Sequence, residues 1–346
     1  MAQRIRFQDL ISSQAFYLHD INHTQASYIG MREEDFQKSS FLDGRISKLA
    51  DAAQFKLGLD AVLASPAWTT RQALNPPAYI FHLSHVGSTL LAKALGESAT
   101  CLSLREPAPL RYLASQVAEA GEPHSWLSAE MFTQLLAYVE HHLGRPLGAR
   151  TEVLVKCTSW VNEIAHLLLK QEQSRAVFLY CRLEKFVINI LKPGGGLVDL
   201  MGGAAQRVKR LNKLQSQVVE LKALSHGDIA AMTWLCEMLT LSQAGQGRQH
   251  APTWMDFDDY LLDAVAGTEQ AAHSLGLRWD AADTQRLVAS GTLNKYSKSD
   301  GGKSFTQQDR LNELAKLKTE YASEIDKALT WIEPWLLRHP ELTRFA

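Results

Sequence analysis

The feature that most constrains the fold of this chain is an apolar run that ends in a small-residue turn and continues as a helical pattern. Residues 79–83 are rich in β-forming side chains and follow the chain breaker Asn75-Pro76-Pro77. Gly87 comes next, and the apolar residues beyond it recur at helical spacing, at Leu90, Leu91, Ala94 and Leu95. This pattern predicts a strand, a tight turn and a helix in direct succession.

Further apolar runs have the length of buried strands, and each precedes a helical pattern. They occupy residues 153–155 and 176–180, with a weaker run at 253–255. We expect strands near 78–83, 152–156 and 176–181. Short apolar runs that alternate with helices are typical of a parallel sheet covered on both faces. The predicted fold class is therefore α/β, a three-layer parallel sheet like that of P-loop NTPases, with helical additions at both ends.

The remaining periodic segments predict helices and suggest how the chain is divided. Apolar stripes indicate helices over 208–221 and 229–239, another over 46–63, and a last one from about Thr306 that Pro334 interrupts. We expect a mostly helical N-terminal extension over 1–76, an α/β domain over 77–305, and a C-terminal helix over 306–346 that packs on the same domain.

Composition excludes several classes of function. The chain has 36 basic and 37 acidic residues and a net charge of −1, so it lacks the positive field that non-specific nucleic-acid binding requires. We expect no nucleic-acid partner. No stretch approaches the roughly 20 apolar residues that span a bilayer, and the first residues have no signal-peptide pattern. We expect a cytoplasmic protein with no membrane span, whose four cysteines are reduced and mostly buried.

The turn after the first strand has the residues of an anion site. A helix N-terminus offers unpaired N–H groups and the positive end of the helix dipole. Gly87 lets the backbone approach a ligand, and Ser84, Ser88 and Thr89 add hydroxyl groups. We therefore expect a phosphorylated nucleotide at residues 83–91. A simple helix cap by Ser88 or Thr89 explains the same residues and stays open. The GxxxxGK[ST] pattern of a Walker A loop is absent from this turn.

Residues 81–91, Phe-His-Leu-Ser-His-Val-Gly-Ser-Thr-Leu-Leu, resemble the 5′-phosphosulfate loop of sulfotransferases. These enzymes use 3′-phosphoadenosine 5′-phosphosulfate (PAPS) and release adenosine 3′,5′-bisphosphate (PAP). The resemblance implies that the nucleotide contacts Ser84, His85, Val86, Gly87, Ser88, Thr89 and Leu90. One departure stands out, because His85 replaces the family's Arg or Lys and an imidazole holds a phosphate oxygen less firmly than a fixed cation.

Later segments continue the resemblance in the same order. Leu104-Arg105-Glu106-Pro107 is similar to the segment that carries a catalytic glutamate in protein-tyrosine sulfotransferases, and 155–159 resembles the strand-end lysine segment. Residues 178–189 resemble the strand and helix that hold the 3′-phosphate, which implies roles for Arg182 and Asn189. Asn189 stands seven residues after Arg182, where the family has a serine one residue later. Tyr296-Ser297-Lys298 resembles a C-terminal phosphate loop of uncharacterised bacterial members and adds Lys298.

The residue types suit sulfuryl transfer, with alternatives at each position. Glu106 is a candidate general base for an acceptor hydroxyl, or else a cap for the helix that begins near Pro107. Lys156, at the end of a buried strand, is a candidate for holding charge that moves during transfer, as is His85. Arg182 binds phosphate or pairs with Glu184. The basic residues of 207–213 are interpreted as the solvated face of a helix.

These observations favour a PAPS-dependent sulfotransferase that acts on a hydroxyl or amine of a small molecule, glycan or peptide. No metal is expected, because His82 and His85 lie three residues apart on a strand and point to opposite faces. Two alternatives remain. One is a kinase-like phosphotransferase that needs a nucleotide and Mg²⁺, and the other is a non-catalytic nucleotide-binding protein. The polar loop 295–303 is either a solvated loop or a lid over the nucleotide.

Overall fold

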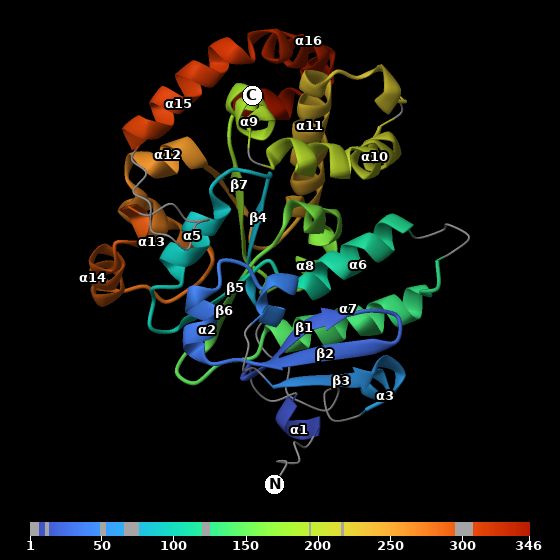
Figure 1. Ribbon diagram of the computed structural model, residues 1–346, viewed down its shortest axis with the longest axis vertical. Helices are drawn as coiled ribbons and strands as arrows, with labels where there is room; N and C mark the ends of the chain where they lie inside the picture. Colours follow the sequence, from blue (N-terminus) through green and yellow to red (C-terminus); the bar gives the residue numbers. More distant parts are fainter. Residues whose placement is uncertain are drawn as a thin grey trace.

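A five-stranded parallel sheet forms the centre of the protein (Figure 1). The computed structural model describes residues 7–10, 14–48, 53–65, 76–119, 125–193, 195–215, 218–294 and 307–346. In spatial order the strands are β5 (Cys101–Arg105), β6 (Glu152–Lys156), β4 (Ala78–His82), β7 (Ala176–Tyr180) and β8 (Thr253–Asp256). The strands predicted near 78–83, 152–156, 176–181 and 253–255 are all present, and β5 was not predicted as a strand.

Helices cover both faces of this sheet, which confirms the predicted α/β fold class (Figure 1). On one side lie α5 (Ser88–Leu95), α12 (Phe257–Leu262), α13 (Ala264–Ser274) and α14 (Ala281–Ser290), with the short η4 (Thr292–Asn294). On the other lie α6 (Ala108–Glu119), η2 (Ser159–Ile164), α8 (Ala165–Leu168), α9 (Leu183–Leu191), α10 (Gly196–Leu214), η3 (Leu221–Ala223) and α11 (His226–Gly245). Helix α10 ends at Leu214, short of the predicted 208–221, whereas α11 contains the whole predicted stripe 229–239.

The N-terminal region differs from the prediction. It contains a three-stranded antiparallel sheet of β1 (Phe16–Ile21), β2 (Gln25–Gly30) and β3 (Gln54–Gly58). Its helices are α1 (Phe7–Leu10), α2 (Glu33–Lys38), η1 (Gly44–Lys48) and α3 (Leu59–Leu63), and α7 (Ala129–Leu143) packs on β1. The helix expected over 46–63 is wrong, and so is the mostly helical extension. The side chains of β3 alternate in exposure along the strand, and pairing with β2 overrides the apparent helical period.

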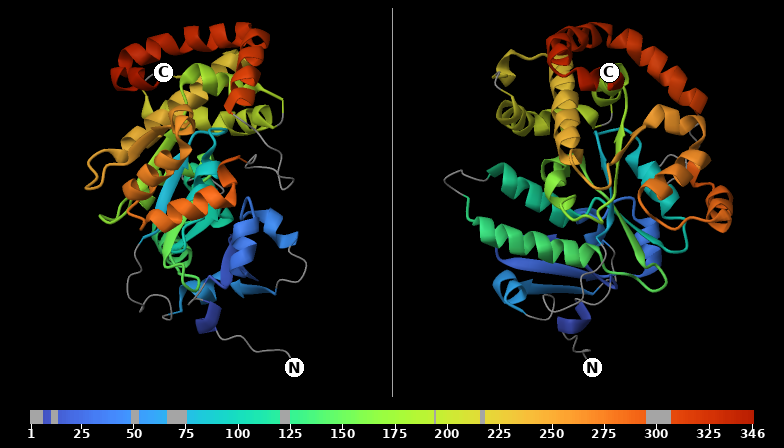
Figure 2. Two further views of the ribbon diagram at one scale, coloured as in Figure 1. Left: turned by 90° about the vertical axis from the view of Figure 1, so that its left-hand side faces the viewer. Right: turned by 180° about the vertical axis from the view of Figure 1, so that it is seen from behind.

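Two C-terminal helices arch over the end of the molecule opposite the N-terminus (Figure 2). They are α15 (Gln307–Glu320) and α16 (Ala322–Arg338), followed by η5 (Pro340–Phe345). The predicted interruption at Pro334 is wrong, because Pro334 lies inside α16 and the two helices meet at Tyr321. The buried residues of α16 pack against α11, and this packing outweighs the loss of one backbone hydrogen bond at the proline.

Two further observations bear on the class of protein. Within the described ranges, no helix combines the length and the apolar character that crossing a membrane requires. All four cysteines are buried and carry free thiols. The domain boundaries at 76 and 305 stay a prediction.

Candidate functional site

A cavity of about 100 Å³ lies at the carboxyl ends of the central strands, under the loop that joins β4 to α5. Gly87 caps α5 with a left-handed backbone at φ 71°, and its carbonyl oxygen accepts a hydrogen bond of 2.8 Å from the Leu90 N–H. The loop therefore turns within a few residues and presents the N-terminus of α5 to the cavity. The lining residues are His82, Ser84, His85, Val86, Gly87, Ser88, Thr89, Glu106, Arg111, Lys156, Thr158, Ser159, Trp160 and Asp199.

Two residues of the cavity wall have a strained backbone. His85 at φ 61° and Glu106 at φ 60° are the two residues other than glycine with positive φ in the part of the chain that the structure describes. This conformation costs about 1–3 kcal/mol per residue and collects at functional sites. Both residues were predicted as site residues, and both line the cavity.

Glu106 and Lys156 form an ion pair on one wall. Strands β5 and β6 pair in parallel up to Arg105 and Lys156, and the N–H of Glu106 donates to the Lys156 carbonyl at 2.7 Å. The Lys156 side chain is only 2% exposed, and the Glu106 carboxylate is 17% exposed. The second carboxylate oxygen of Glu106 lies 3.9 Å from the Arg45 guanidinium. Glu106 thus faces two cations, Lys156 in the cavity wall and Arg45 beside it, which favours a role at the cavity over capping of α6.

The hydroxyl groups of the cavity include two without partners. The Oγ atoms of Ser84 and Ser159 lie 2.7 Å apart in a hydrogen bond. Among the described residues, the hydroxyls of Thr89 and Thr158 are buried and make no hydrogen bond. Buried polar groups are nearly always satisfied, so these two donors are suited to the oxygens of an incoming anion.

His82 at the end of β4 and His85 in the following loop have different surroundings. The Nε2 of His85 lies 3.3 Å from a carboxylate oxygen of Asp199. The ring nitrogens of His82 face backbone carbonyls, that of Leu83 at 2.6 Å and that of Cys157 at 2.7 Å. No group of three or more metal-ligating side chains occurs within the described ranges. The absence of a metal site stays a prediction.

Arg182 and Asn189 lie outside this cavity. Arg182 precedes α9, and its Nε is 3.9 Å from Asp256 at the start of α12. Glu184 pairs instead with Lys318 at 2.8 Å. Asn189 is buried in α9, and its amide nitrogen has no hydrogen-bond partner in the described part of the chain. Lys298 and the 295–303 loop lie outside the described residues.

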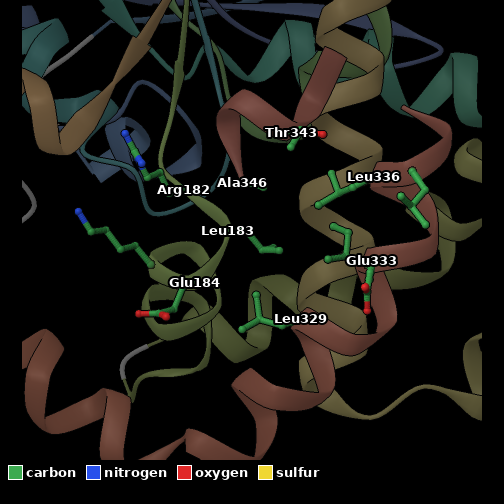
Figure 3. A pocket seen from close by; sticks show the side chains of 11 residues that line it. Arg182, Leu183, Glu184, Leu329, Glu333, Leu336, Thr343 and Ala346 are labelled. Carbon is green, nitrogen blue, oxygen red and sulfur yellow. The ribbon is translucent and has the colours of Figure 1, made fainter. Parts of the chain in front are cut away.

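Arg182 lines a second, larger pocket of about 610 Å³ (Figure 3). The wall is mostly apolar and includes Leu183, Leu329 and Leu336 from α9 and α16. Helix α12 is next to both pockets. Its N-cap residue, Asp256, lies 3.9 Å from Arg182, and the ring of Phe257, its first residue, lies directly against Gly87 of the first cavity. The two predicted phosphate regions are therefore neighbours of the same short helix.

The basic residues of 207–213 include two that are not on a solvated face. Arg207 and Arg210 are 4% and 8% exposed, and both bind the carboxylate of buried Glu237 at 2.8 Å. Their interpretation as a solvated face is wrong. The signal in the sequence was Glu237, an acidic residue within the apolar stripe of a helix that is buried on nearly all sides.

The N-terminal region also supplies residues that the sequence did not indicate. Buried Arg105 donates to the carbonyl of Ser39, and the Leu42 N–H donates to the Arg105 carbonyl at 2.6 Å. Burial lowers the pKa of Arg105 to about 10. These contacts hold Phe41 with its ring centre 5.8 Å from the Lys156 Nζ, and Phe41 stacks under Arg45.

Comparison with known proteins gives a structural likeness only. No family model and no curated protein matches the chain. The sulfotransferase domain of an olefin synthase from Synechococcus PCC 7002 is 15% identical with a TM-score of 0.39, covering 73% of this chain and 96% of that one. The sulfotransferase domain of the curacin biosynthetic pathway is 11% identical with a TM-score of 0.39, covering 72% and 99%. A sulfotransferase from Mycobacterium avium is 13% identical with a TM-score of 0.39, covering 76% and 80%. Because these identities and TM-scores are low, the likeness carries no argument about activity, which has to come from the residues of the site.

Proposed function

We propose that this protein transfers the sulfuryl group of PAPS to a hydroxyl or amine acceptor. The observation that carries the proposal is the ion pair of buried Lys156 with partly exposed Glu106, which shares one cavity with the loop 84–89. In-line transfer of a charged group needs a site that binds the anion, with an acid and a base beside it. The loop 84–89 is the anion site, and Lys156 and Glu106 are the acid and the base. The acceptor is a small molecule, a glycan or a peptide.

The cradle fits the 5′-phosphosulfate. The N-terminus of α5 points N–H groups and its dipole at the cavity, and the unpartnered hydroxyls of Thr89 and Thr158 line it. A volume of about 100 Å³ suits a sulfuryl or phosphoryl group rather than a whole nucleotide. The nucleoside then lies outside the cavity, and we assign its 3′-phosphate to Arg182 and Asn189, together with Lys298, which lies outside the described residues.

The residues divide the chemical work as follows. The acceptor oxygen forms a bond to sulfur while the bond from sulfur to the 5′-phosphate oxygen breaks, and that electron pair leaves with PAP. Glu106 takes the acceptor proton, and Lys156 holds the charge that develops on the phosphate. Because Lys156 and Glu106 are paired before the reaction, the bound donor has to draw Lys156 from Glu106, which frees the carboxylate to act as base.

A binding experiment tests the proposal against its alternatives. Calorimetry and thermal shift compare PAP, ATP and GTP, each with and without Mg²⁺. We expect PAP to bind most tightly and without metal. Preference for ATP or GTP with Mg²⁺ would instead identify a kinase-like phosphotransferase. Tight PAP binding with no transfer to a panel of acceptors and no PAPS hydrolysis would indicate a non-catalytic nucleotide-binding protein.

A further inference from the structure

A buried cluster of charged residues lies directly behind the cavity. Glu237 of α11 accepts from the Arg207 Nε at 2.8 Å, from an Arg210 Nη at 2.8 Å and from the Asn162 amide at 2.9 Å. Glu237 is only 1% exposed. Burial by itself raises the pKa of Glu237, but Arg210 and Arg207 outweigh it and hold that pKa below its ordinary value. The carboxylate is therefore ionised, and one negative charge is shared by two guanidinium groups.

A second carboxyl belongs to the same cluster on the Arg210 side. Glu163 interacts with Arg210 and accepts a hydrogen bond of 2.6 Å from the Gln206 amide. The other contacts of Arg207 lie toward the Ser159 Oγ at 3.4 Å and the Asp199 carbonyl at 3.5 Å. Arg207 is therefore the arginine of the cluster that extends toward the residues lining the cavity.

Hydrogen bonds connect Arg207 to the cavity. The Nη2 of Arg207 donates to the Ser159 Oγ at 3.4 Å, and Ser159 is bonded to Ser84 at 2.7 Å. Both serines line the cavity. On the other side, Asn162 joins Glu237 to the carbonyl of His82, the last residue of β4, at 3.1 Å. The cluster therefore contacts the end of β4 directly and the loop 84–89 through Ser159.

A glycine makes room for the guanidinium. A Cβ added to Gly203 would collide with the Nη1 of Arg207, one turn further along α10. Glycine inside a helix is less stable than alanine, so Gly203 weakens α10 but leaves the space that the Arg207 guanidinium occupies. The neighbouring Gly202 has open space around it, and a Cβ there meets no atom within 4 Å.

We infer that Arg207 is a positioning residue that supplies fixed positive charge, through Ser159 and Ser84, to a phosphate or sulfate ester held by the loop 84–89. It acts where the loop carries His85 in place of a fixed cation. The inference rests on the proposed function for the identity of the anion as a phosphosulfate, and the charge itself suits any phosphate or sulfate group.

The sharpest test moves the guanidinium without removing it. Gly203→Ala displaces Arg207, and Gly202→Ala is the matched control on the same helix. Calorimetry measures the affinity for inorganic pyrophosphate and for PAP, at low and high salt, and thermal melting checks the fold. We expect Gly203→Ala to weaken both ligands about tenfold and to reduce the salt dependence. We expect its melting temperature to fall, because displaced Arg207 leaves Glu237 with one partner fewer, but to stay above the temperature of the binding assay. Gly202→Ala should bind like the wild type.

Substitution of the arginine itself gives a second readout. Arg207→Met should weaken pyrophosphate at least as much as Gly203→Ala, and Arg207→Lys should recover part of the affinity because it restores charge. Lys213→Met, an exposed basic residue on the same helix, is the control. If Arg207→Met unfolds because Glu237 loses a partner, the comparison of the two glycine variants still decides.

The outcomes separate this inference from the proposed function. Wild-type affinity for pyrophosphate in both Gly203→Ala and Arg207→Met overturns the inference, whatever PAP does. A wild-type protein that binds neither ligand overturns it as well. Binding of pyrophosphate without preference for PAP, with loss in the variants, contradicts the proposed function and supports the inference.

Discussion

Lys156 and Glu106 are joined twice, once through their backbones and once through their side chains. The Glu106 N–H donates to the Lys156 carbonyl at 2.7 Å, and the lysine Nζ pairs with the carboxylate. The backbone bond continues the β5–β6 ladder one residue past the end of β5, to the last residue of β6. The position of the ion pair is therefore set by the central sheet rather than by a flexible loop, which suits a reacting pair that has to be held in place.

This pair leads to a prediction about catalysis. Glu106→Gln keeps the shape of the side chain and removes its basicity. Turnover should fall roughly 10²–10⁴-fold with little change in PAP affinity, while Lys156→Ala should lower turnover more than PAP binding. The measurements are sulfuryl transfer, PAP calorimetry and melting temperature. A loss of about 1 kcal/mol in stability with near-normal activity of Glu106→Gln would instead identify a helix cap.

A second prediction concerns the 3′-phosphate. Arg182→Ala should lower the affinity for PAP about tenfold and leave that for AMP unchanged, because AMP lacks the 3′-phosphate and the lost contact is worth roughly 1.4 kcal/mol. Arg32→Ala is the control, since Arg32 is an exposed arginine in the N-terminal region. Equal losses for PAP and AMP would show that Arg182 does not recognise the 3′-phosphate.

A third prediction concerns Gly87, whose Cβ position is taken by the Phe257 ring. Gly87→Ala should reduce the free energy of unfolding by about 1–2 kcal/mol for the left-handed backbone and about 1–3 kcal/mol more for the collision. Gly148→Ala has a similar positive φ with open space around it, so it should show the first cost alone. Denaturant unfolding measures both, and equal losses would mean that Phe257 moves aside freely.

A fourth prediction concerns pH. Burial raises the pKa of Glu140 from 4.5 to about 7, so the folded state binds an extra proton between these values. The free energy of unfolding is highest below the pKa of the unfolded state, 4.5, and it declines as pH rises to the folded-state pKa of about 7. The decline is at most about 3 kcal/mol, and it is smaller for a partly shielded group. Glu140→Gln should flatten the stability curve between pH 4.5 and about pH 7, the two pKa values of the carboxyl. The exposed Glu130→Gln on the same helix should leave it unchanged.

The central strands were readable from the sequence because buried parallel strands are short, continuous apolar runs. β5 was missed because it buries Ser103 and Arg105 along with its apolar residues. The position of Lys156 at the end of a buried strand was also predicted correctly, because a charged residue at the end of an apolar run is easily recognised. Arg207 was wrongly placed on the solvated face of a helix, because the partner of Arg207, Glu237, lies 30 residues away and no local pattern shows that pairing.

The contacts of Arg105 have a consequence for any attempt to shorten this protein. Its guanidinium is satisfied by carbonyls of the segment around Ser39, and that same segment brings Phe41 and Arg45 to the Glu106–Lys156 pair. A chain cut to begin at residue 77 would leave the buried guanidinium of Arg105 with the Ser103 carbonyl, at 3.4 Å, in place of its acceptors around Ser39, and would remove Phe41 from beside Lys156. The parallel sheet thus does not stand alone, and the segment before it completes the surroundings of the Glu106–Lys156 pair.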